Sequence, residues 1–202
     1  MKIVYNVGVS DAIVYLLNKY KEKQIFRPNN LYDLTKTIFE TLKDKEFKLE
    51  ENNGKIGIDL SQFGLEFDNE IFYYLEFPLI QNFLEFEEFI LVGTEQKERN
   101  QNSAKDTYYL AKILELVLRK KGKKVKVIKL SNNPVELKAM FSFYKKIIEE
   151  ENPDYFNITT GTPIQSIAIS LLAYKFDKKV VYKPWNNKGL EIWDIKKLVE
   201  GD

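Results

Sequence analysis

Short apolar runs alternate with longer segments of helical spacing along this chain, most regularly after residue 88. The runs that predict buried strands are 89–92, 125–130, 155–158 and 179–182. The segments that predict helices are 104–121, a stretch that ends at 150, and 163–176. Strands that alternate with helices of this length are typical of right-handed βαβ units, so we expect a mainly parallel sheet. A last strand over 189–195, antiparallel to its neighbour, and a short charged tail complete the pattern.

The N-terminal part follows a less regular pattern. Residues 2–7 predict a first buried strand that ends at Gly8. Ser10 or Asp11 then suits the N-cap of an amphipathic helix that runs to about residue 21. The spacing of apolar residues over 31–43 predicts a second helix.

A β-hairpin is predicted next. Residues 47–51 and 55–60 flank Asn52-Asn53-Gly54, and Asn and Gly tolerate the positive φ angles that tight hairpin turns require. Residues 65–86 are rich in Phe, Leu and Glu, with a proline at position 78. Their pattern fixes no single structure, and a broken pair of helices is one interpretation.

The most informative segment is Thr159–Pro163, between a predicted strand and a predicted helix. Pro163 suits the first helical position, where its missing N–H costs nothing, and Thr160 or Thr162 can cap the amides of the first turn. Such a turn directs N–H groups and hydroxyls at one spot, and the helix dipole favours negative charge there. The segment therefore predicts an anion site, most simply for a phosphate.

Three other strand ends carry polar loops that a parallel sheet would bring to the same edge. They are Gly8-Val9-Ser10-Asp11, Gly93-Thr94-Glu95-Gln96 and Ser131-Asn132-Asn133-Pro134, with Lys97, Arg99 and Lys105 close in sequence. This combination of amides, hydroxyls, carboxamides and cations suits a phosphate-bearing ligand whose bases or sugars need hydrogen bonds. Each loop, the Thr159–Pro163 turn included, also has a purely structural interpretation, because helix N-caps and strand ends use the same residue types.

The amino-acid composition limits the partners, metals and catalytic groups that can be expected. The chain has 202 residues, 31 Lys+Arg, 30 Asp+Glu, and no Cys or His. A formal charge of +1 gives no basic field for long nucleic acid. Without Cys or His there is no disulfide, thiolate nucleophile, usual zinc ligand or histidine base, and we expect no metal and no other cofactor.

The same sequence gives no sign of a membrane segment. No apolar run reaches the roughly 20 residues that a membrane span requires, and the N-terminus lacks the layout of a signal peptide. We therefore expect a soluble, cytoplasmic protein. Two common nucleotide-binding signatures are also missing, since neither G-x-x-x-x-G-K-[ST] nor, after the first strand, G-x-G-x-x-G occurs.

Four motifs, in this order along the chain, resemble the CARF domains (CRISPR-associated Rossmann fold), especially those of Csm6-type ribonucleases. They are Ile90–Gln96 with Lys105–Ala111, Asn133-Pro134 with the helix through Tyr144, Asn157–Gln165 with the apolar helix behind it, and Val181–Pro184. The resemblance is good from about 89 to 190, looser over the first strand and Gly8–Asp11, and absent from about 27 to 86. It implies a single α/β, Rossmann-like domain over residues 1–202, with helices on both faces of a mainly parallel sheet and an insertion at about 27–86.

The resemblance also implies a homodimer with a shared pocket on its two-fold axis. The implied ligand is a cyclic oligoadenylate of four or six nucleotides, the second messenger of type III CRISPR antiviral signalling. In the family such binding controls an attached or downstream effector domain. The implied ligand-binding residues here are Gly8, Val9, Ser10, Asp11, Thr94, Glu95, Gln96, Lys105, Asn132, Thr159, Thr160, Gly161, Thr162, Pro163 and Gln165. A symmetric ring of phosphodiesters could be met from both sides by two copies of the Thr159–Pro163 turn.

Two alternatives stay open. The usual HEPN ribonuclease domain of this family needs a catalytic His, which this chain lacks, so the chain is part of a longer effector protein, a stand-alone sensor or a metal-independent ring nuclease. A ring nuclease would need only to align a ribose 2′-OH with the adjacent phosphorus and stabilise the developing charge; Thr159, Thr160, Ser10 and Lys105 are candidates by location. The other alternative is a nucleotide- or sugar-phosphate-binding domain with no link to CRISPR.

Overall fold

The computed structural model describes residues 1–17, 23–26, 29–67, 69–97, 103–131, 136–184 and 189–201. Its first sheet has the strand order β12-β11-β10-β1-β8-β9 and is parallel except for the edge strand β12. The strands are β1 (Lys2–Asn6), β8 (Glu88–Thr94), β9 (Lys124–Leu130), β10 (Tyr155–Asn157), β11 (Lys179–Tyr182) and β12 (Glu191–Asp194).

The strand order is that of a Rossmann fold. Counted along the chain, these six strands lie in the order 3-2-1-4-5-6 across the sheet. The order reverses between β1 and β10, and open α/β sheets bind their ligands at such a switch point, beyond the carboxyl ends of the strands. The predicted Rossmann-like class, including the antiparallel last strand, is confirmed.

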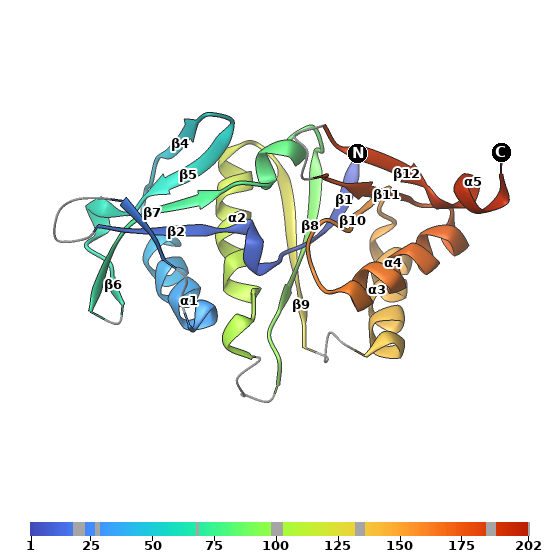
Figure 1. The fold of residues 1–202 in the computed structure, drawn as a ribbon, viewed down its shortest axis with the longest axis horizontal. Coiled ribbons are helices and arrows are strands. Elements are labelled where there is room, and N and C mark those ends of the chain that lie inside the picture. The colour runs from blue at the N-terminus through green and yellow to red at the C-terminus, as the bar shows by residue number, and fades with distance from the viewer. Residues whose placement is uncertain are drawn as a thin grey trace.

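Helices cover both faces of this sheet (Figure 1). Alternate residues of β1 enter different cores: Ile3 and Tyr5 pack with residues of α2 (Tyr108–Lys120), and Val4 packs with residues of α3 (Leu137–Glu151) and α4 (Pro163–Phe176). A strand that is buried on both faces reads as a continuous apolar run, which explains why this strand was predictable. The predicted charged tail is a short helix, α5 (Ile195–Glu200). No helix among the described residues is long and apolar enough to cross a membrane.

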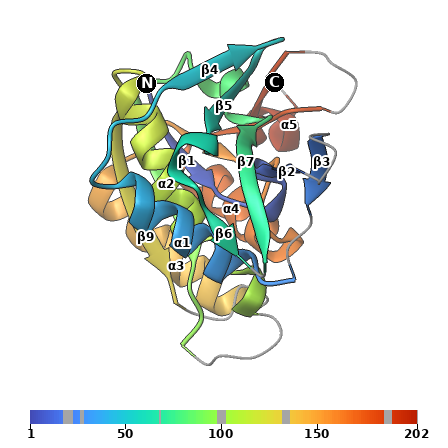
Figure 2. The ribbon, with the colours of Figure 1, turned by 90° about the vertical axis from the view of Figure 1, so that its left-hand side faces the viewer.

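A second, antiparallel sheet lies on the α2 side of the molecule, together with α1 (Figure 1). Its strand order is β3-β2-β7-β5-β4, with the short β6 paired to β7. The elements are β2 (Ile13–Leu17), β3 (Lys23–Phe26), α1 (Leu31–Leu42), β4 (Leu49–Asn52), β5 (Lys55–Asp59), β6 (Glu66–Phe67) and β7 (Glu70–Phe77). The second α-helix and the β-hairpin of the predictions are confirmed, and Figure 2 shows the hairpin above the rest of this lobe.

Two predictions for this lobe are wrong. The segment after Asp11 forms β2, where a helix was predicted, and the part of that helix beyond residue 17 lies partly outside the described residues. Residues 13–17 are all apolar, so their pattern fits the periodicity of a helix and that of a strand. The antiparallel pairing of β2 with β3 and β7 makes this segment a strand. Residues 65–86 form β6, β7 and a 3₁₀ turn (Ile80–Phe83) instead of a helix pair. The second sheet therefore begins at β2, earlier than the predicted insertion at about 27–86.

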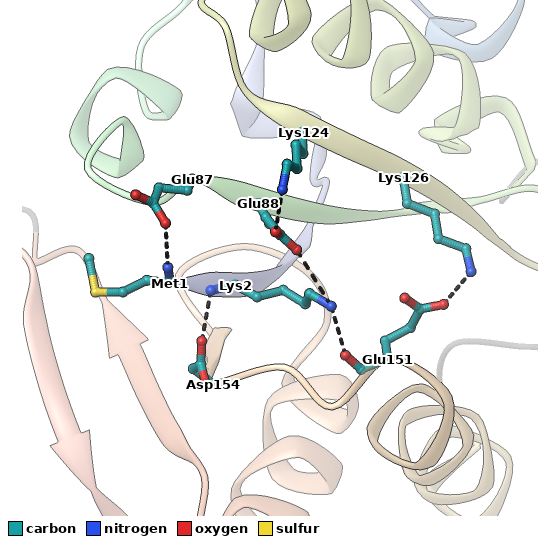
Figure 3. Close-up of polar contacts among 8 residues, drawn as sticks. All are labelled: Met1, Lys2, Glu87, Glu88, Lys124, Lys126, Glu151 and Asp154. Carbon is teal, nitrogen blue, oxygen red and sulfur yellow. Dashed lines mark hydrogen bonds and ion pairs between the residues drawn. The ribbon is translucent and has the colours of Figure 1, made fainter.

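Charged side chains hold the amino edge of the parallel sheet, at the opposite end from the switch point (Figure 3). The Met1 ammonium contacts the Glu87 carboxylate at 3.0 Å, and the Lys2 backbone N–H donates to Asp154 at 2.9 Å. The Lys2 ammonium donates to the Glu151 carbonyl oxygen at 2.9 Å and lies 3.5 Å from the Glu88 carboxylate. These contacts join the starts of β1 and β8 to the end of α3.

We predict that Gly93→Ala destabilises the fold. A Cβ atom at Gly93 would lie 2.7 Å from the Tyr108 Cα atom, because β8 and α2 approach closely there. The Thr107 carbonyl oxygen would lie 3.0 Å from the same Cβ atom. Since both of these neighbours are backbone atoms at the start of α2, we expect a loss of about 1–3 kcal/mol in the free energy of unfolding, measured by urea denaturation. Gly189→Ala is the matched control, because a Cβ there meets open space. Equal stability of the two variants would contradict the prediction.

Candidate functional site: two glycine turns at the switch point

The loops that follow β1 and β10 meet at the switch point. A Cβ atom added to Gly8 would lie 3.3 Å from the Gly161 backbone nitrogen and 3.3 Å from the Thr160 Cβ atom. Any larger residue at position 8 would therefore press on the Thr159–Pro163 turn. Two of the four predicted loops are thus in contact at the place where Rossmann-like sheets hold ligands.

The start of α4 has the cap that the sequence predicts. Pro163 is the first helical residue, the Thr162 hydroxyl accepts from the Gln165 N–H at 3.3 Å, and the Gln165 side-chain oxygen accepts from the Thr162 N–H at 2.6 Å. This reciprocal arrangement is a capping box. The predicted capping role of Thr162 is therefore present, and the Gln165 side-chain oxygen completes the cap.

A buried hydrogen-bond network lies beneath the turn. The Gln165 amide nitrogen donates to the Tyr144 hydroxyl at 3.0 Å, and this hydroxyl donates to the Asn6 side-chain oxygen at 2.6 Å. The Asn6 side chain donates in turn to the Asn157 carbonyl oxygen at 3.1 Å, and the Asn157 side chain donates to the Thr160 hydroxyl at 3.1 Å. The Thr160 hydroxyl itself donates to the Asn6 carbonyl oxygen. The network thus binds the ends of β1 and β10 to α3 and α4.

Gly161 is an exposed glycine in this turn. Its φ angle is +98°, a conformation that favours glycine, and its backbone is exposed. Within the described part of the chain, the Gly161 N–H donates to no acceptor. A backbone donor beside the first turn of a helix attracts an anion, because both the N–H group and the helix dipole favour negative charge.

Thr159 and Thr160, named as candidates for cleavage, are held by the protein. The Thr159 hydroxyl accepts from the Lys183 N–H at 2.8 Å, and the Thr159 N–H donates to the Asn157 side-chain oxygen at 2.8 Å. Thr160 is 4% exposed, and its hydroxyl belongs to the buried network. Both hydroxyls therefore shape the turn.

After β1, Asp11 faces inward. Its carboxylate accepts from the Tyr5 hydroxyl at 2.5 Å and from the Gly8 N–H at 2.7 Å, and it is 1% exposed. Burial raises the pKa of Asp11 to about 7, although both hydrogen bonds act to lower it. The neighbouring Val9 and Ser10 are exposed. Asp11 thus fixes the Gly8 turn from below, while Val9 and Ser10 lie on its outer side.

The loop after β8 is tied to the start of α2. Gly93 and Thr94 still belong to β8, which extends two residues beyond the predicted strand. The Thr107 N–H donates to the Thr94 hydroxyl at 3.1 Å, and the Thr107 hydroxyl donates to the Val7 carbonyl oxygen at 2.8 Å. Through Thr107, the end of β8 and the end of β1 are linked.

The remaining predicted residues divide into three groups. Glu95 forms an ion pair with Lys129 at 2.6 Å and accepts from the Tyr32 hydroxyl, and the Gln96 N–H donates to the buried Asp106 at 2.9 Å. Lys105 is exposed, in a 3₁₀ turn that precedes α2. Asn132 and Arg99 lie outside the described residues. The described residues include no group of three or more Asp and Glu side chains placed to hold a metal ion.

No site role was predicted for Asn6, Asn157 or Tyr144, although Asn157 and Tyr144 lie within the motifs that resemble CARF domains. Asn6 and Asn157 are the last residues of two otherwise apolar strands, and this position could have revealed them, since a buried amide needs a partner. Tyr144 lies on an apolar helix face, where it resembles an ordinary core aromatic. Burial raises the pKa of its hydroxyl well above the usual value, so this group acts as a neutral donor and acceptor.

Comparison with known proteins finds a similarity of fold rather than of sequence. No protein-family model and no curated protein sequence matches the chain. Among solved structures, the fold is similar to that of Enterococcus italicus Csm6 bound to cyclic hexa-2'-fluoro-hexa-dAMP, with a TM-score of 0.44 and 10% sequence identity. The similarity covers 99% of this chain and 37% of that chain, so this chain spans just over a third of the length of that Csm6.

We predict a stability that falls with rising pH because of Asp11. Unfolded Asp ionises near a pKa of about 3.9, but the folded pKa is about 7, so the folded state binds more protons between these values. The free energy of unfolding should therefore fall by about 3 kcal/mol between pH 4 and pH 7 from this group. Asp11→Asn removes the titration and keeps a side chain of the same shape.

Urea denaturation of both proteins across pH 4 to 8 measures this effect. Wild type should lose stability relative to Asp11→Asn as the pH rises, and the difference should level off above pH 7. If the free energies of unfolding of the two proteins changed with pH in parallel, a raised pKa of the buried Asp11 carboxyl would be contradicted.

Proposed function

We propose that this chain is the sensor domain of a type III CRISPR signalling protein and binds cyclic oligoadenylate at the interface of a homodimer. The observation that carries the proposal is the pair of glycine turns at the switch point, where the Gly161 N–H has no acceptor among the described residues and lies against Gly8. The ordered motifs that resemble CARF domains support the same function. The ring has four or six nucleotides, and its phosphates face the Gly8 and Gly161 turns of both subunits.

The exposed face of α4 supports a second copy as the partner. Residues 163–174 contain no charged side chain, and Ile167, Leu171 and Tyr174 are 47%, 51% and 40% exposed. The spacing of four and three residues places them on one face. A helix with apolar residues on all sides is normally buried, so we expect another protein surface to pack against this face. Because α4 begins at the Thr159–Pro163 turn, an interface along α4 would bring two such turns together.

Binding, not cleavage, is the function that the turn favours. The hydroxyls of Thr159 and Thr160 accept or donate within the protein, and a group held in this way positions a ligand more readily than it activates a nucleophile. Effector control follows from a ring that joins two subunits, since it favours one arrangement of the dimer over others.

We predict that wild type binds cyclic tetra- or hexa-adenylate tightly, and that Gly8→Val weakens binding at least about 100-fold. Gly8 has φ −107° and ψ 169°, which valine tolerates, but the added side chain would press on the Gly161 nitrogen. Calorimetry with each ring measures the affinity, and gel filtration with light scattering confirms that the variant keeps its oligomeric state. Gly189→Val, at an open position, is the matched control.

The outcomes separate the candidate functions. If a folded Gly8→Val variant bound the ring with unchanged affinity, the glycine turns would not be part of the binding site. Release of linear products with 2′,3′-cyclic phosphate ends would identify a ring nuclease. Failure of wild type to bind either ring would contradict the proposed function and favour an unrelated phosphate-ligand domain.

A second prediction concerns the dimer. Leu171→Glu places a charge on the apolar face of α4 and should convert a dimer into a monomer, seen by light scattering at micromolar concentration. Ile71→Glu is the matched control, because Ile71 is also about half exposed, at 48%, but lies on β7 of the second sheet. A monomeric wild type, or a dimer that survives Leu171→Glu unchanged, would contradict this interface.

A further inference from the structure

A cavity of about 410 Å³ adjoins Thr159, the first residue of the Thr159–Pro163 turn. Three parts of the chain line it: the tip of the β4–β5 hairpin (Asn53, Gly54, Lys55), the segment after β7 (Pro78, Leu79, Asn82), and the ends of β10 and β11 (Thr159, Lys183, Pro184). Its volume is in the range of small-molecule sites. Apart from Thr159, none of these residues was predicted to bind a ligand.

The cavity is built by fixed backbone. Asn53 and Gly54 both have positive φ angles, 51° and 71°, as a two-residue hairpin turn requires. The Lys55 ammonium contacts Glu76 of β7 at 2.9 Å, and the Asn82 side-chain N–H donates to the Leu79 carbonyl oxygen at 2.9 Å. On the opposite side, the Lys183 N–H is held by the Thr159 hydroxyl. The walls therefore come from two sheets, and contacts within the protein hold them.

The lining has a chemistry that suits an aromatic base. Pro78, Leu79 and Pro184 offer apolar surface, and Asn53 and Asn82 offer carboxamides. Lys183 supplies a positive charge, whereas the Lys55 ammonium is paired with Glu76. No Asp or Glu lines the described wall, which disfavours a metal cation. An Asn carboxamide can form paired hydrogen bonds with the donor and acceptor edge of adenine.

We propose that this cavity holds one adenine base of the ligand and that the Asn53 carboxamide recognises it. The inference rests on the proposed function and names the part of the protein that selects the base. Thr159 connects the two sites, because it lines the cavity and also opens the turn whose Gly161 N–H meets the phosphate. A nucleotide with its phosphate at Gly161 could thus place its base against the hairpin tip. The second sheet would supply base specificity, and the Rossmann-like sheet would hold the phosphate.

Titration of the whole chain with AMP and with UMP, followed by ¹H–¹⁵N NMR, tests the base site without the ring. AMP at millimolar concentration should shift the amide signals of Asn53, Gly54, Lys55 and Lys183, and UMP should bind at least about tenfold more weakly. An absence of shifts with AMP, shifts confined to the Gly8 and Gly161 turns, or equal affinity for the two nucleotides would overturn the proposal.

Asn53→Gly gives a variant with an undisturbed backbone. Glycine tolerates the φ angle of 51° and removes only the carboxamide. Asn69→Gly is the matched control, since Asn69 has φ 62° in another turn and does not line the cavity. Asn53→Gly should lose about tenfold or more in affinity for AMP and for the cyclic oligoadenylate that wild type binds, and Asn69→Gly should lose none.

The result distinguishes the two proposals. If wild type binds the ring and Asn53→Gly binds it equally well, the base site is wrong and the proposed function stands. If wild type binds neither ring, the proposed function is wrong, and the AMP titration alone decides the base site.

Discussion

The architecture depends on the need to satisfy buried polar groups where β1 and β10 end side by side. At the switch point the two strands run in parallel and their last residues, Asn6 and Asn157, are almost fully buried. Their amide groups cannot reach water, so the Tyr144 hydroxyl donates to the Asn6 side chain and the Thr160 hydroxyl accepts from the Asn157 side chain. Gln165 supports this arrangement by donating to the Tyr144 hydroxyl. A buried polar group without a partner costs free energy, and a fully connected network fixes one arrangement. The position of the Gly161 turn follows from this network.

The two ends of the parallel sheet have opposite character. At the amino edge, charges of both signs neutralise one another in contacts such as Met1–Glu87 and Lys124–Glu88. At the carboxyl edge, the Gly8 and Gly161 turns present backbone, and the Asp11 carboxyl beneath them is buried with its pKa raised to about 7. A carboxyl that is partly neutral near pH 7 repels an anion less than an ordinary aspartate would. The carboxyl edge is therefore the better place for a phosphate.

The second sheet replaces the first crossover of a simple Rossmann fold and shares a core with the first sheet. Ile56 and Phe77 of this sheet lie in the same apolar cluster as Ile3, Leu91 and Leu114. The hairpin is thereby fixed against the parallel sheet, and its tip reaches the ends of β10 and β11. The second sheet thus supplies one wall of a cavity at the edge of the parallel sheet where Rossmann-like folds bind ligands.

The sequence by itself determined the parallel half of the protein and the start of α4, because buried strands such as β8 and the capped helix at Pro163 depend on local pattern. It also placed the Gly161 turn, since a strand end followed by a capped helix favours a glycine with positive φ. Only the tertiary structure decided the rest. The pattern of residues 13–17 fits a helix or a strand equally well, and their pairing with β7 selects the strand. The burial of the Asp11 side chain depends on how the chain packs around it. The buried network and the cavity beside Asn53 each bring together residues that are far apart in the sequence. Local sequence encodes propensity, whereas burial and hydrogen-bond partners are set by contacts between distant segments.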